Sequence, residues 1–261
     1  MKIFVLKKNA FVFYSLMGLL LVTLFLANTH ESVSVSSLQA GKLLPVYSVE
    51  RDGKTVCITF DAAWEDADTQ DIINILKKYD IRATFFVTGD FVDRCADSVK
   101  ALYDAGHEIA NHSDQHPHPN KLSAEKLKED TLKCDEKIKA VTGKNLPLYR
   151  SPYGEYNNAV IQTINSMGYS FIQWDTDSLD YKDLTAEQIT ERITKRVRPG
   201  SIVLFHNGTK NTAKALPGIL EKLIADGYTF LPAGEMIYRE NYYIDHTGRQ
   251  FVKDAQITSE E

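Results

Sequence analysis

The chain of 261 residues contains only three cysteines, Cys57, Cys95 and Cys134, and none has the Cys-x-x-Cys spacing of redox motifs or structural zinc sites. A disulfide framework is therefore excluded, because three cysteines form one disulfide at most. Cys57 lies within the apolar stretch 55–60 and is expected to be a small buried residue. Cys95 and Cys134 can either pair or remain free thiols, and we favour free thiols.

Basic residues are not in excess: 30 lysines and arginines stand against 35 aspartates and glutamates, and the formal net charge is −5. No patch of lysines and arginines interleaved with aromatic residues occurs. Proteins that bind nucleic acid use such patches to neutralise phosphates. We therefore expect no nucleic-acid partner.

A long uncharged apolar run occurs once, over residues 10–27, and it follows Lys2, Lys7 and Lys8. Its length approaches the roughly 20 residues that cross the hydrocarbon core of a membrane. We interpret residues 1–28 as a cytoplasmic stub and an uncleaved signal-anchor helix, which leaves the rest of the chain outside the cytoplasm. A cleaved signal peptide is the alternative, although residues 26–30 offer a poor cleavage site.

Residues 29–53 are rich in serine and lack a sustained helical pattern, which is typical of a spacer. One folded domain is predicted over 54–236, followed by a polar, irregular tail over 237–261, and we expect a monomer. Within the domain, apolar strand-like stretches alternate with amphipathic helical ones. Strands are expected at 55–60, 83–88, 107–111, 146–151, 169–174, 201–205 and 228–231, and helices at 69–79, 96–105, 123–141, 157–167, 185–197 and 213–225.

Helix boundaries carry clear signals. Ser123 can cap one helix, with Gly143 as its stop signal, and Thr185-Ala-Glu-Gln188 matches a capping box for another. Because near-continuous apolar strands alternate with helices, the sequence predicts an α/β fold with a parallel sheet. About seven strand–helix units in a chain of this length favour a distorted (β/α)7-type barrel over an open sheet.

Two histidines four residues apart, in His112-Ser-Asp-Gln-His116, form the most informative motif of the chain. On a helical turn this spacing places both imidazoles on one side, where they can bind one divalent metal ion. Solvated loop histidines are the alternative.

A carboxylate and a guanidinium each follow an apolar strand. Asp61 ends the stretch 55–60, where an unpaired carboxylate would be costly to desolvate. Arg150 precedes Pro152, and a bidentate contact with Asp61 would hold the carboxylate in its charged form. The alternatives are a helix cap or turn residue for Asp61 and a surface side chain for Arg150.

His206 ends the apolar strand 201–205 and precedes Asn-Gly. A histidine there can donate a proton to a leaving nitrogen, provided that a carboxylate such as Asp180 raises its pKa and fixes its ring. The alternative is a core histidine that is satisfied by backbone groups.

Five motifs occur in order: Thr59-Phe60-Asp61, His112-Ser-x-x-His116, Arg150-x-Pro-Tyr153, the Asp-rich segment ending in Asp180-Tyr181, and Leu204-x-His206. Together they resemble the polysaccharide deacetylases of the NodB-homology family, carbohydrate esterase family 4. The resemblance spans residues 54–232. The membrane-tethered, sporulation-type peptidoglycan deacetylases are the most similar members, which implies a location at the cell surface or spore envelope.

The resemblance implies a role for each catalytic group. Asp61 matches the base that takes a proton from the attacking water, and Arg150 matches the residue that tethers this base. The backbone amide of Tyr153 would face the oxyanion. Asp180 would tune His206, which matches the acid that protonates the departing amine.

The resemblance also implies the binding groups. His112 and His116 match the family's metal-binding histidines, and the metal would be Zn²⁺, with Co²⁺ or Mn²⁺ as alternatives. Leu204 matches the apolar residue that lines the pocket for the acetyl methyl group. Trp174 and Tyr181 are expected to contact the sugar, although Tyr181 stands where the family tends to carry tryptophan.

One departure concerns the metal. The family usually has a second aspartate directly after the base as the third ligand, and this chain has Ala62 there. Either Asp66 or Glu65 supplies a carboxylate from the same loop, and we favour Asp66, or the metal site is weak.

The leading hypothesis is a metal-dependent hydrolase that removes N-acetyl groups from amino sugars of a cell-envelope polysaccharide, most simply peptidoglycan. The rival is a catalytically weak or inactive glycan-binding module that lost its third metal ligand. A structural envelope protein would explain none of the motifs.

Overall fold

The computed structural model describes residues 41–253, and the compact unit that carries the candidate site begins at Lys42. The expected membrane anchor lies outside the described residues. Within the described range, no helix combines the length and the apolar character that a membrane crossing requires. All three cysteines are free, and Cys57 and Cys134 are buried, in agreement with the preferred interpretation.

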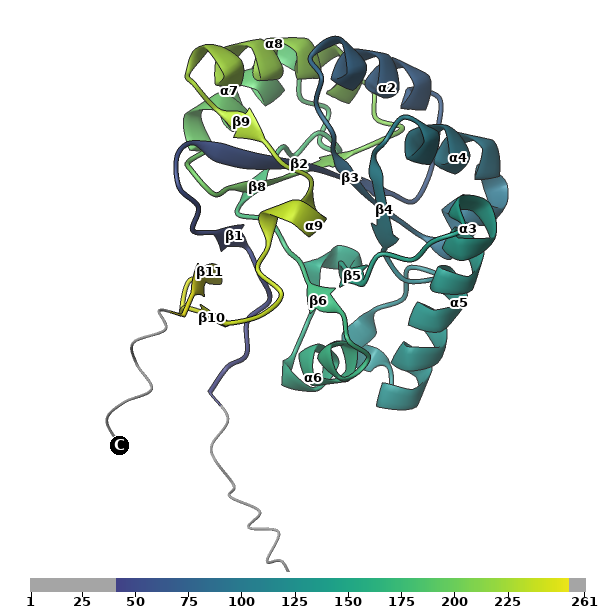
Figure 1. Ribbon diagram of the computed structural model, residues 1–261. Helices are drawn as coiled ribbons and strands as arrows, with labels where there is room; N and C mark the ends of the chain where they lie inside the picture. The colour runs from purple at the N-terminus through teal and green to yellow at the C-terminus, as the bar shows by residue number, and fades with distance from the viewer. Residues whose placement is uncertain (1–40, 254–261) are drawn as a thin grey trace, which may run out of the picture. The chain divides into compact units, whose positions relative to one another are not determined.

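A curved parallel sheet forms the centre of the fold (Figure 1), with the strand order β6-β5-β4-β3-β2-β8-β7. Its strands are β2 (Thr55–Ala62), β3 (Thr84–Val87), β4 (Glu108–Asn111), β5 (Leu148–Tyr149), β6 (Ser170–Phe171), β7 (Thr176–Asp177) and β8 (Ile202–His206), and β9 (Thr229–Phe230) pairs with the start of β2. Every neighbouring pair is parallel, as expected. No pairing joins β6 to β7 in the described chain, so the sheet is a curled half-barrel rather than a closed barrel.

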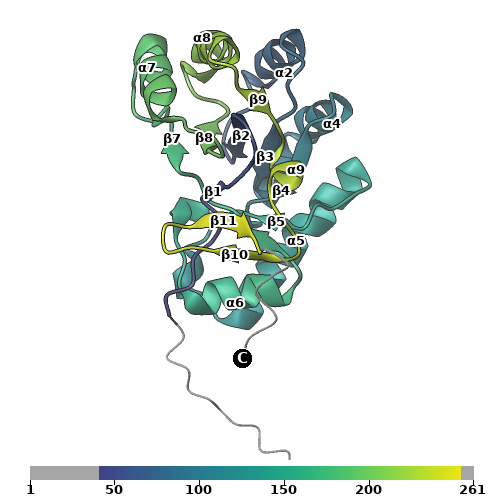
Figure 2. The same cartoon turned by 60° about the vertical axis from the view of Figure 1, so that its left-hand side comes forward.

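Helices cover the outer face of this sheet, as Figure 2 shows for α7, α8, α2 and α4. They are α2 (Thr69–Lys78), α3 (Gly89–Arg94), α4 (Ala96–Asp104), α5 (Ala124–Thr142), α6 (Asn158–Ser166), α7 (Ala186–Arg196) and α8 (Thr212–Ala225). The short helix α9 (Ala233–Met236) packs instead against the inner face, where Ala233 and Met236 join a second apolar cluster. Short 3-10 turns lie at Pro119–Lys121 and Pro152–Gly154. The sequence did not predict α3 and α9, which have six and four residues and are too short to show a helical period.

The expected helix signals are confirmed. The Ser123 side chain accepts a hydrogen bond from the Lys126 amide, and α5 ends at Gly143, whose φ of 75° is accessible to glycine without strain. At the start of α7, Thr185 and Gln188 form both hydrogen bonds of a capping box.

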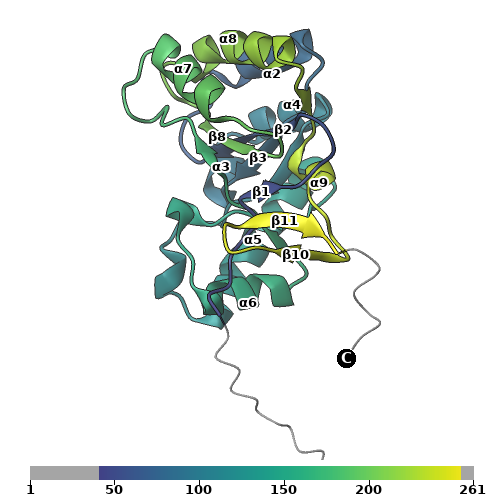
Figure 3. The same cartoon turned by 90° about the vertical axis from the view of Figure 1, so that its left-hand side faces the viewer.

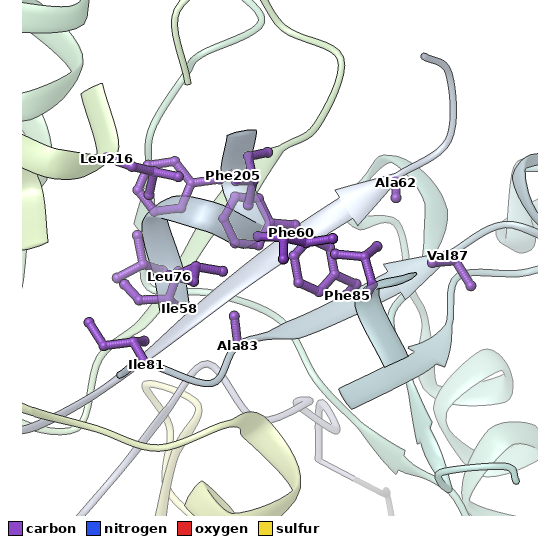
Figure 4. Close-up of a cluster of buried hydrophobic side chains, with 14 of the residues drawn as sticks. Ile58, Phe60, Ala62, Leu76, Ile81, Ala83, Phe85, Val87, Phe205 and Leu216 are labelled. Atoms are coloured by element: carbon purple, nitrogen blue, oxygen red, sulfur yellow. The ribbon is translucent and has the colours of Figure 1, made fainter. Parts of the chain in front are cut away.

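Strict alternation along β2 separates the core from the site. Phe60 and Ala62 face the helices and pack in the largest apolar cluster (Figure 4), where the Phe60 ring stacks on Phe85 at 4.6 Å. Thr59 and Asp61 point to the opposite face, where both accept hydrogen bonds from Arg150. The pleat of one buried strand therefore directs Asp61 away from the core.

The expected spacer and tail boundaries are wrong in part. Strand β1 (Ser48–Val49) lies within the expected spacer, and β10 (Tyr242–Ile244) and β11 (Arg249–Val252) lie within the expected irregular tail. They form a second sheet in the order β1-β11-β10 (Figure 3).

The reason for this difference is tertiary packing. Val46 and Val49 are buried in the cluster on the inner face of the main sheet, and Val46 forms a bridge to Ile172. Strands of two to four residues are too short for a recognisable alternation, so the sequence alone gave no signal for them.

Candidate active site

A cavity of about 550 Å³ opens at the carboxyl ends of the strands. It is lined by Asp61, Trp64, His112, His116, Tyr153, Gly154, Trp174, Asp177, Tyr181, Leu204 and His206. Two further predicted residues, Arg150 and Asp180, lie behind this wall and contact Asp61 and His206. The structure thus brings together all predicted site residues except Asp66.

Asp61 and Arg150 form a buried ion pair, in which Nη1 of Arg150 lies 2.8 Å from Oδ1 of Asp61. The predicted bidentate contact is wrong: the same Nη1 also donates to Thr59 Oγ1 at 2.8 Å, and Nη2 donates to the Gln173 carbonyl at 3.2 Å. The second oxygen of Asp61, Oδ2, is left to face His112 Nε2 at 3.6 Å. The guanidinium therefore fixes one carboxylate oxygen and leaves the other directed into the site.

The charge state of Asp61 follows from these contacts. Burial by itself would raise the pKa of Asp61, but the positive charge of Arg150, its hydrogen bond and the nearby His206 outweigh it and lower the pKa below its ordinary value. The carboxylate is consequently ionised at neutral pH and can accept a proton.

The segment from His112 to His116 is an irregular loop after β4, not the helical turn that we expected from the spacing. Ser113 and His116 have φ values of 70° and 53°, in the left-handed region. Local hydrogen bonds hold this shape, because Asn111 Oδ1 accepts from the Ser113 amide and Ser113 Oγ accepts from the His116 amide. The two imidazole rings nevertheless lie close together, with centroids 5.1 Å apart.

Both imidazoles are held in the neutral form, in which a ring nitrogen has a lone pair that can bind a metal ion. Burial lowers the pKa of His112, and it lowers the pKa of His116 to about 4. Nδ1 of His112 lies 2.9 Å from the carbonyl oxygen of Arg150, which can only accept, so this nitrogen carries the proton. The lone pair is then on Nε2, which faces Asp61; metal-binding histidines are commonly oriented in this way.

The carboxylate that we expected as a third metal ligand does not lie beside the two histidines. Asp66 does not line the cavity, and its carboxylate accepts a hydrogen bond from Ser98 Oγ at 2.7 Å. Ala62 is fully buried in the apolar cluster on the other face of β2. Across residues 41–253, no group of three or more histidine, cysteine, aspartate or glutamate side chains is arranged to hold a metal ion. Two neutral imidazoles fit a divalent cation, and Asp61 Oδ2 is the carboxylate oxygen that the structure places beside them.

His206 and Asp180 form the second polar pair. Nδ1 of His206 lies 2.7 Å from Asp180 Oδ1, and Asp180 Oδ2 accepts from the His206 amide at 2.8 Å and from Thr212 Oγ1 at 2.6 Å. Burial alone would lower the pKa of His206, but the hydrogen bond and charge of Asp180 outweigh it and raise the pKa. The ring is thus fixed, and its protonated form is favoured, as the sequence predicted.

Aromatic side chains form the mouth of the cavity. Tyr153 is exposed, and its ring packs between His116 and His118, with centroids 4.5 Å and 4.3 Å away. Tyr181 meets His206 edge-on at 5.3 Å. Together with Trp174 they give the site the apolar walls and few convergent polar groups that are typical of ligand pockets.

Sequence reasoning missed three lining residues, Trp64, Gly154 and Asp177. Trp64 follows Asp61 by three positions and is one of only two tryptophans in the chain, and both line the cavity. A large aromatic residue in a polar loop directly after a candidate catalytic carboxylate was the available signal.

Comparison with known proteins shows which family this chain resembles in sequence. Residues 48–172 match the model of the family described as polysaccharide deacetylase. Peptidoglycan-N-acetylmuramic acid deacetylase PdaA of Bacillus subtilis is 30% identical over 191 residues, which are 72% of this chain and 73% of that protein. A peptidoglycan-N-acetylglucosamine deacetylase of Bacillus cereus is 33% identical over 196 residues, which are 73% of this chain and 92% of the relative.

Solved structures show the same similarity. A carbohydrate esterase family 4 pseudoenzyme from Bacillus anthracis superposes with a TM-score of 0.72 at 30% identity, covering 75% of this chain and 69% of that one. A mutant of this pseudoenzyme is described as having restored enzymatic activity. The structure of PdaA gives a TM-score of 0.71 at 29% identity, covering 74% of this chain and 84% of that one. The chain therefore belongs to the polysaccharide deacetylase family of hydrolases, carbohydrate esterase family 4.

Proposed function

We propose that this protein is a metal-dependent deacetylase that removes N-acetyl groups from amino sugars of peptidoglycan. One observation carries the proposal: the cavity contains an ionised carboxylate, Asp61, and a histidine with a raised pKa, His206, each held by its own buried partner. A base and an acid at one cavity are what amide hydrolysis requires. The named substrates of the Bacillus relatives support peptidoglycan as the glycan.

The residues divide the work of the reaction. Asp61, kept ionised by Arg150, accepts a proton from the attacking water. The backbone N–H of Tyr153 would stabilise the developing oxyanion, and protonated His206 would donate its proton to the departing amine nitrogen. The products are acetate and a free amine on the sugar.

The remaining groups hold cation and substrate. His112 and His116 would bind a divalent cation, most simply Zn²⁺, which would polarise the acetyl carbonyl group. Leu204, buried in the cavity wall, would contact the acetyl methyl group. Trp174 and Tyr181 would contact the sugar ring.

The proposed location follows from the sequence. The apolar run over 10–27 would anchor the chain in the membrane, with the catalytic domain outside the cytoplasm. Peptidoglycan would then be within reach of the cavity.

Acetate release tests the proposal. The purified full-length chain is incubated with N-acetylated chito-oligomers and with muropeptides, with Zn²⁺, Co²⁺ or Mn²⁺ or with a chelator. We expect acetate to be released with at least one metal and release to stop with the chelator. No release from either substrate class with any of the three metals would refute the proposal.

A second candidate is a glycan-binding module that has lost the reaction. It is favoured by Ala62, by the absence of a three-ligand cluster within the described residues, and by the similarity to the Bacillus anthracis pseudoenzyme. Glycan binding and acetate release by the unaltered chain, measured together, separate the two candidates. Retained glycan binding without release of acetate would establish the second.

A further inference from the structure

His107 lies at the end of the sheet opposite the catalytic cavity. It directly precedes β4, whereas His112 directly follows this strand, so five residues of extended chain, roughly 16 Å, separate the two histidines. Only 4% of the surface of His107 is exposed, and its ring packs against Phe85 with centroids 5.4 Å apart. The catalytic site therefore gives no reason for the burial of this histidine.

One ring nitrogen of His107 has a hydrogen-bond partner and the other does not. Nδ1 accepts from the Ala83 amide at 3.3 Å. Because burial lowers the pKa of His107 to about 4, the ring is neutral at pH 7, and its proton is on Nε2. Among residues 41–253, no acceptor lies within hydrogen-bond distance of Nε2. A buried N–H group of this kind destabilises the fold unless a bound molecule supplies an acceptor.

A hollow of about 400 Å³ is lined in part by this histidine. It lies between α2 and the end of α4, which pack side by side (Figure 2), and at the amino ends of β3 and β4. Ile73, Ile81 and Ala105 supply apolar walls. The volume is within the range of ordinary small-molecule sites, so the hollow can hold a ligand that reaches the histidine.

Charges of both signs line the exposed rim of this hollow. Lys77 on α2 and Arg82 before β3 are the cations, and Arg82 already forms an ion pair with a glutamate of α9. Asp80 and Asp104 are the anions, and Asp104 already forms an ion pair with Lys100. Both α2 and α4 also end here, and the carbonyl groups at the carboxyl end of a helix attract positive charge. The hollow therefore suits a ligand that carries one negative and one positive group.

We propose that the distal hollow, defined by Ile73, Lys77, Ile81 and His107, binds a small zwitterionic amino acid with an apolar side chain. The ligand carboxylate would accept from Nε2 of His107 and pair with Lys77, which satisfies the buried N–H group. The ligand ammonium group would face the carboxyl ends of α2 and α4, and its side chain would pack on the two isoleucines. Inorganic phosphate fits less well, because it leaves the apolar walls unused and is repelled by the carboxylates on the rim.

Calorimetric titration of the full-length chain with L-leucine tests the proposal. We expect saturable binding with a Kd of about 1 mM or tighter. N-acetyl-L-leucine, which lacks the ammonium group, and isopentylamine, which lacks the carboxylate, should each bind at least about tenfold more weakly. Absence of saturable leucine binding would overturn the proposal. Tighter binding of inorganic phosphate than of leucine would also overturn it, because the hollow would then be a simple anion site.

Two variants test where leucine binds. His107→Asn keeps an acceptor for the Ala83 amide but removes the Nε2–H group, and it should weaken leucine binding by about tenfold. Lys77→Gln removes one exposed charge from α2 at little cost in helix propensity and should weaken binding by about threefold. Lys78→Gln is the matched control, because this neighbouring exposed lysine does not line the hollow. It should bind leucine as the unaltered chain does.

Urea denaturation separates a loss of binding from a loss of folding. Unchanged leucine affinity in folded His107→Asn would overturn the proposal, and so would equal affinity of Lys77→Gln and Lys78→Gln. If His107→Asn does not fold, the comparison of the two lysine variants decides alone, because neither substitution changes a buried residue.

Discussion

Asp61 and His206 are directly paired residues on the neighbouring parallel strands β2 and β8. Side chains of paired residues in a parallel sheet point to the same face, so both project into one cavity. Arg150 lowers the pKa of Asp61 and Asp180 raises that of His206, which pushes the two pKa values apart. Two titratable groups separated in this way are a recurring basis for acid–base assignments.

Asp61→Asn should reduce acetate release by about 10²- to 10⁴-fold, because the amide cannot accept the proton of the attacking water. The variant should also unfold more easily, by on the order of 3 kcal/mol, because buried Arg150 loses its compensating charge. Activity assays and urea denaturation measure the two effects. Asp80→Asn, an exposed position, is the control, and equal activity of the two variants would contradict the role of Asp61.

Asp180→Asn should change the pH profile of kcat/KM. His206 acts in its protonated form, so activity is lost as the pH rises through its pKa, which Asp180 raises. Without this carboxylate the pKa falls, and the basic limb of the profile should move to lower pH. Thr212→Val, which removes only one hydrogen bond to Asp180, should produce a smaller shift. An unmoved basic limb would argue against His206 as the acid.

Metal affinity should depend on His116 and not on Asp66. His116→Ala removes one of two nitrogen donors and should weaken binding of Zn²⁺ by at least about tenfold in calorimetry. Asp66→Ala should bind Zn²⁺ as the unaltered chain does, because its carboxylate is engaged with Ser98 outside the cavity. A clear loss of affinity in Asp66→Ala would mean that this loop rearranges around the ion.

Asp130 on α5 should matter for the histidine loop without contacting the cavity. Its carboxylate accepts from the amides of Asp114 and Gln115 at 3.0 and 3.3 Å, between the two histidines in sequence. Asp130→Ala should lower the free energy of unfolding by about 2 kcal/mol and weaken Zn²⁺ binding by about threefold. Glu129→Ala, the adjacent exposed residue, is the control. Unchanged metal affinity in Asp130→Ala would show that the loop keeps its shape unaided.

His107 should make the fold sensitive to mild acid. Burial lowers its pKa from 6.5 to about 4, and its Nδ1 accepts from the Ala83 amide. Below pH 6.5 His107 is protonated in the unfolded chain but stays neutral in the folded chain. The stability that neutral His107 contributes to the fold is therefore fully present above pH 6.5 and is lost as the pH falls towards 4. Lowering the pH from 7 to 4.5 should therefore reduce the free energy of unfolding by about 2 kcal/mol through this residue. His107→Asn, which keeps an acceptor, should flatten the dependence in urea denaturation, and an unchanged slope would contradict the assignment.

The sequence predicted the elements whose signals are local. The near-continuous apolar stretch that became β2, the cap at Ser123 and the capping box at Thr185 depend on residues within a few positions of one another. The motifs named most of the residues that line the cavity, because they lie in or after the ends of strands, as Asp61 and His206 do, and parallel strands end at one edge of the sheet.

The sequence by itself determined the longer helices and the main apolar strands, together with the polar groups that cap or end them, because backbone periodicity and capping are set by neighbours along the chain. Only the tertiary structure decided that the histidine loop is not helical, that Asp66 contacts Ser98, and that Trp64 lines the cavity. It also decided that 48–49 pairs with the segment after 236. These outcomes depend on contacts between residues far apart in sequence, and packing selects among orientations that are equivalent in local propensity.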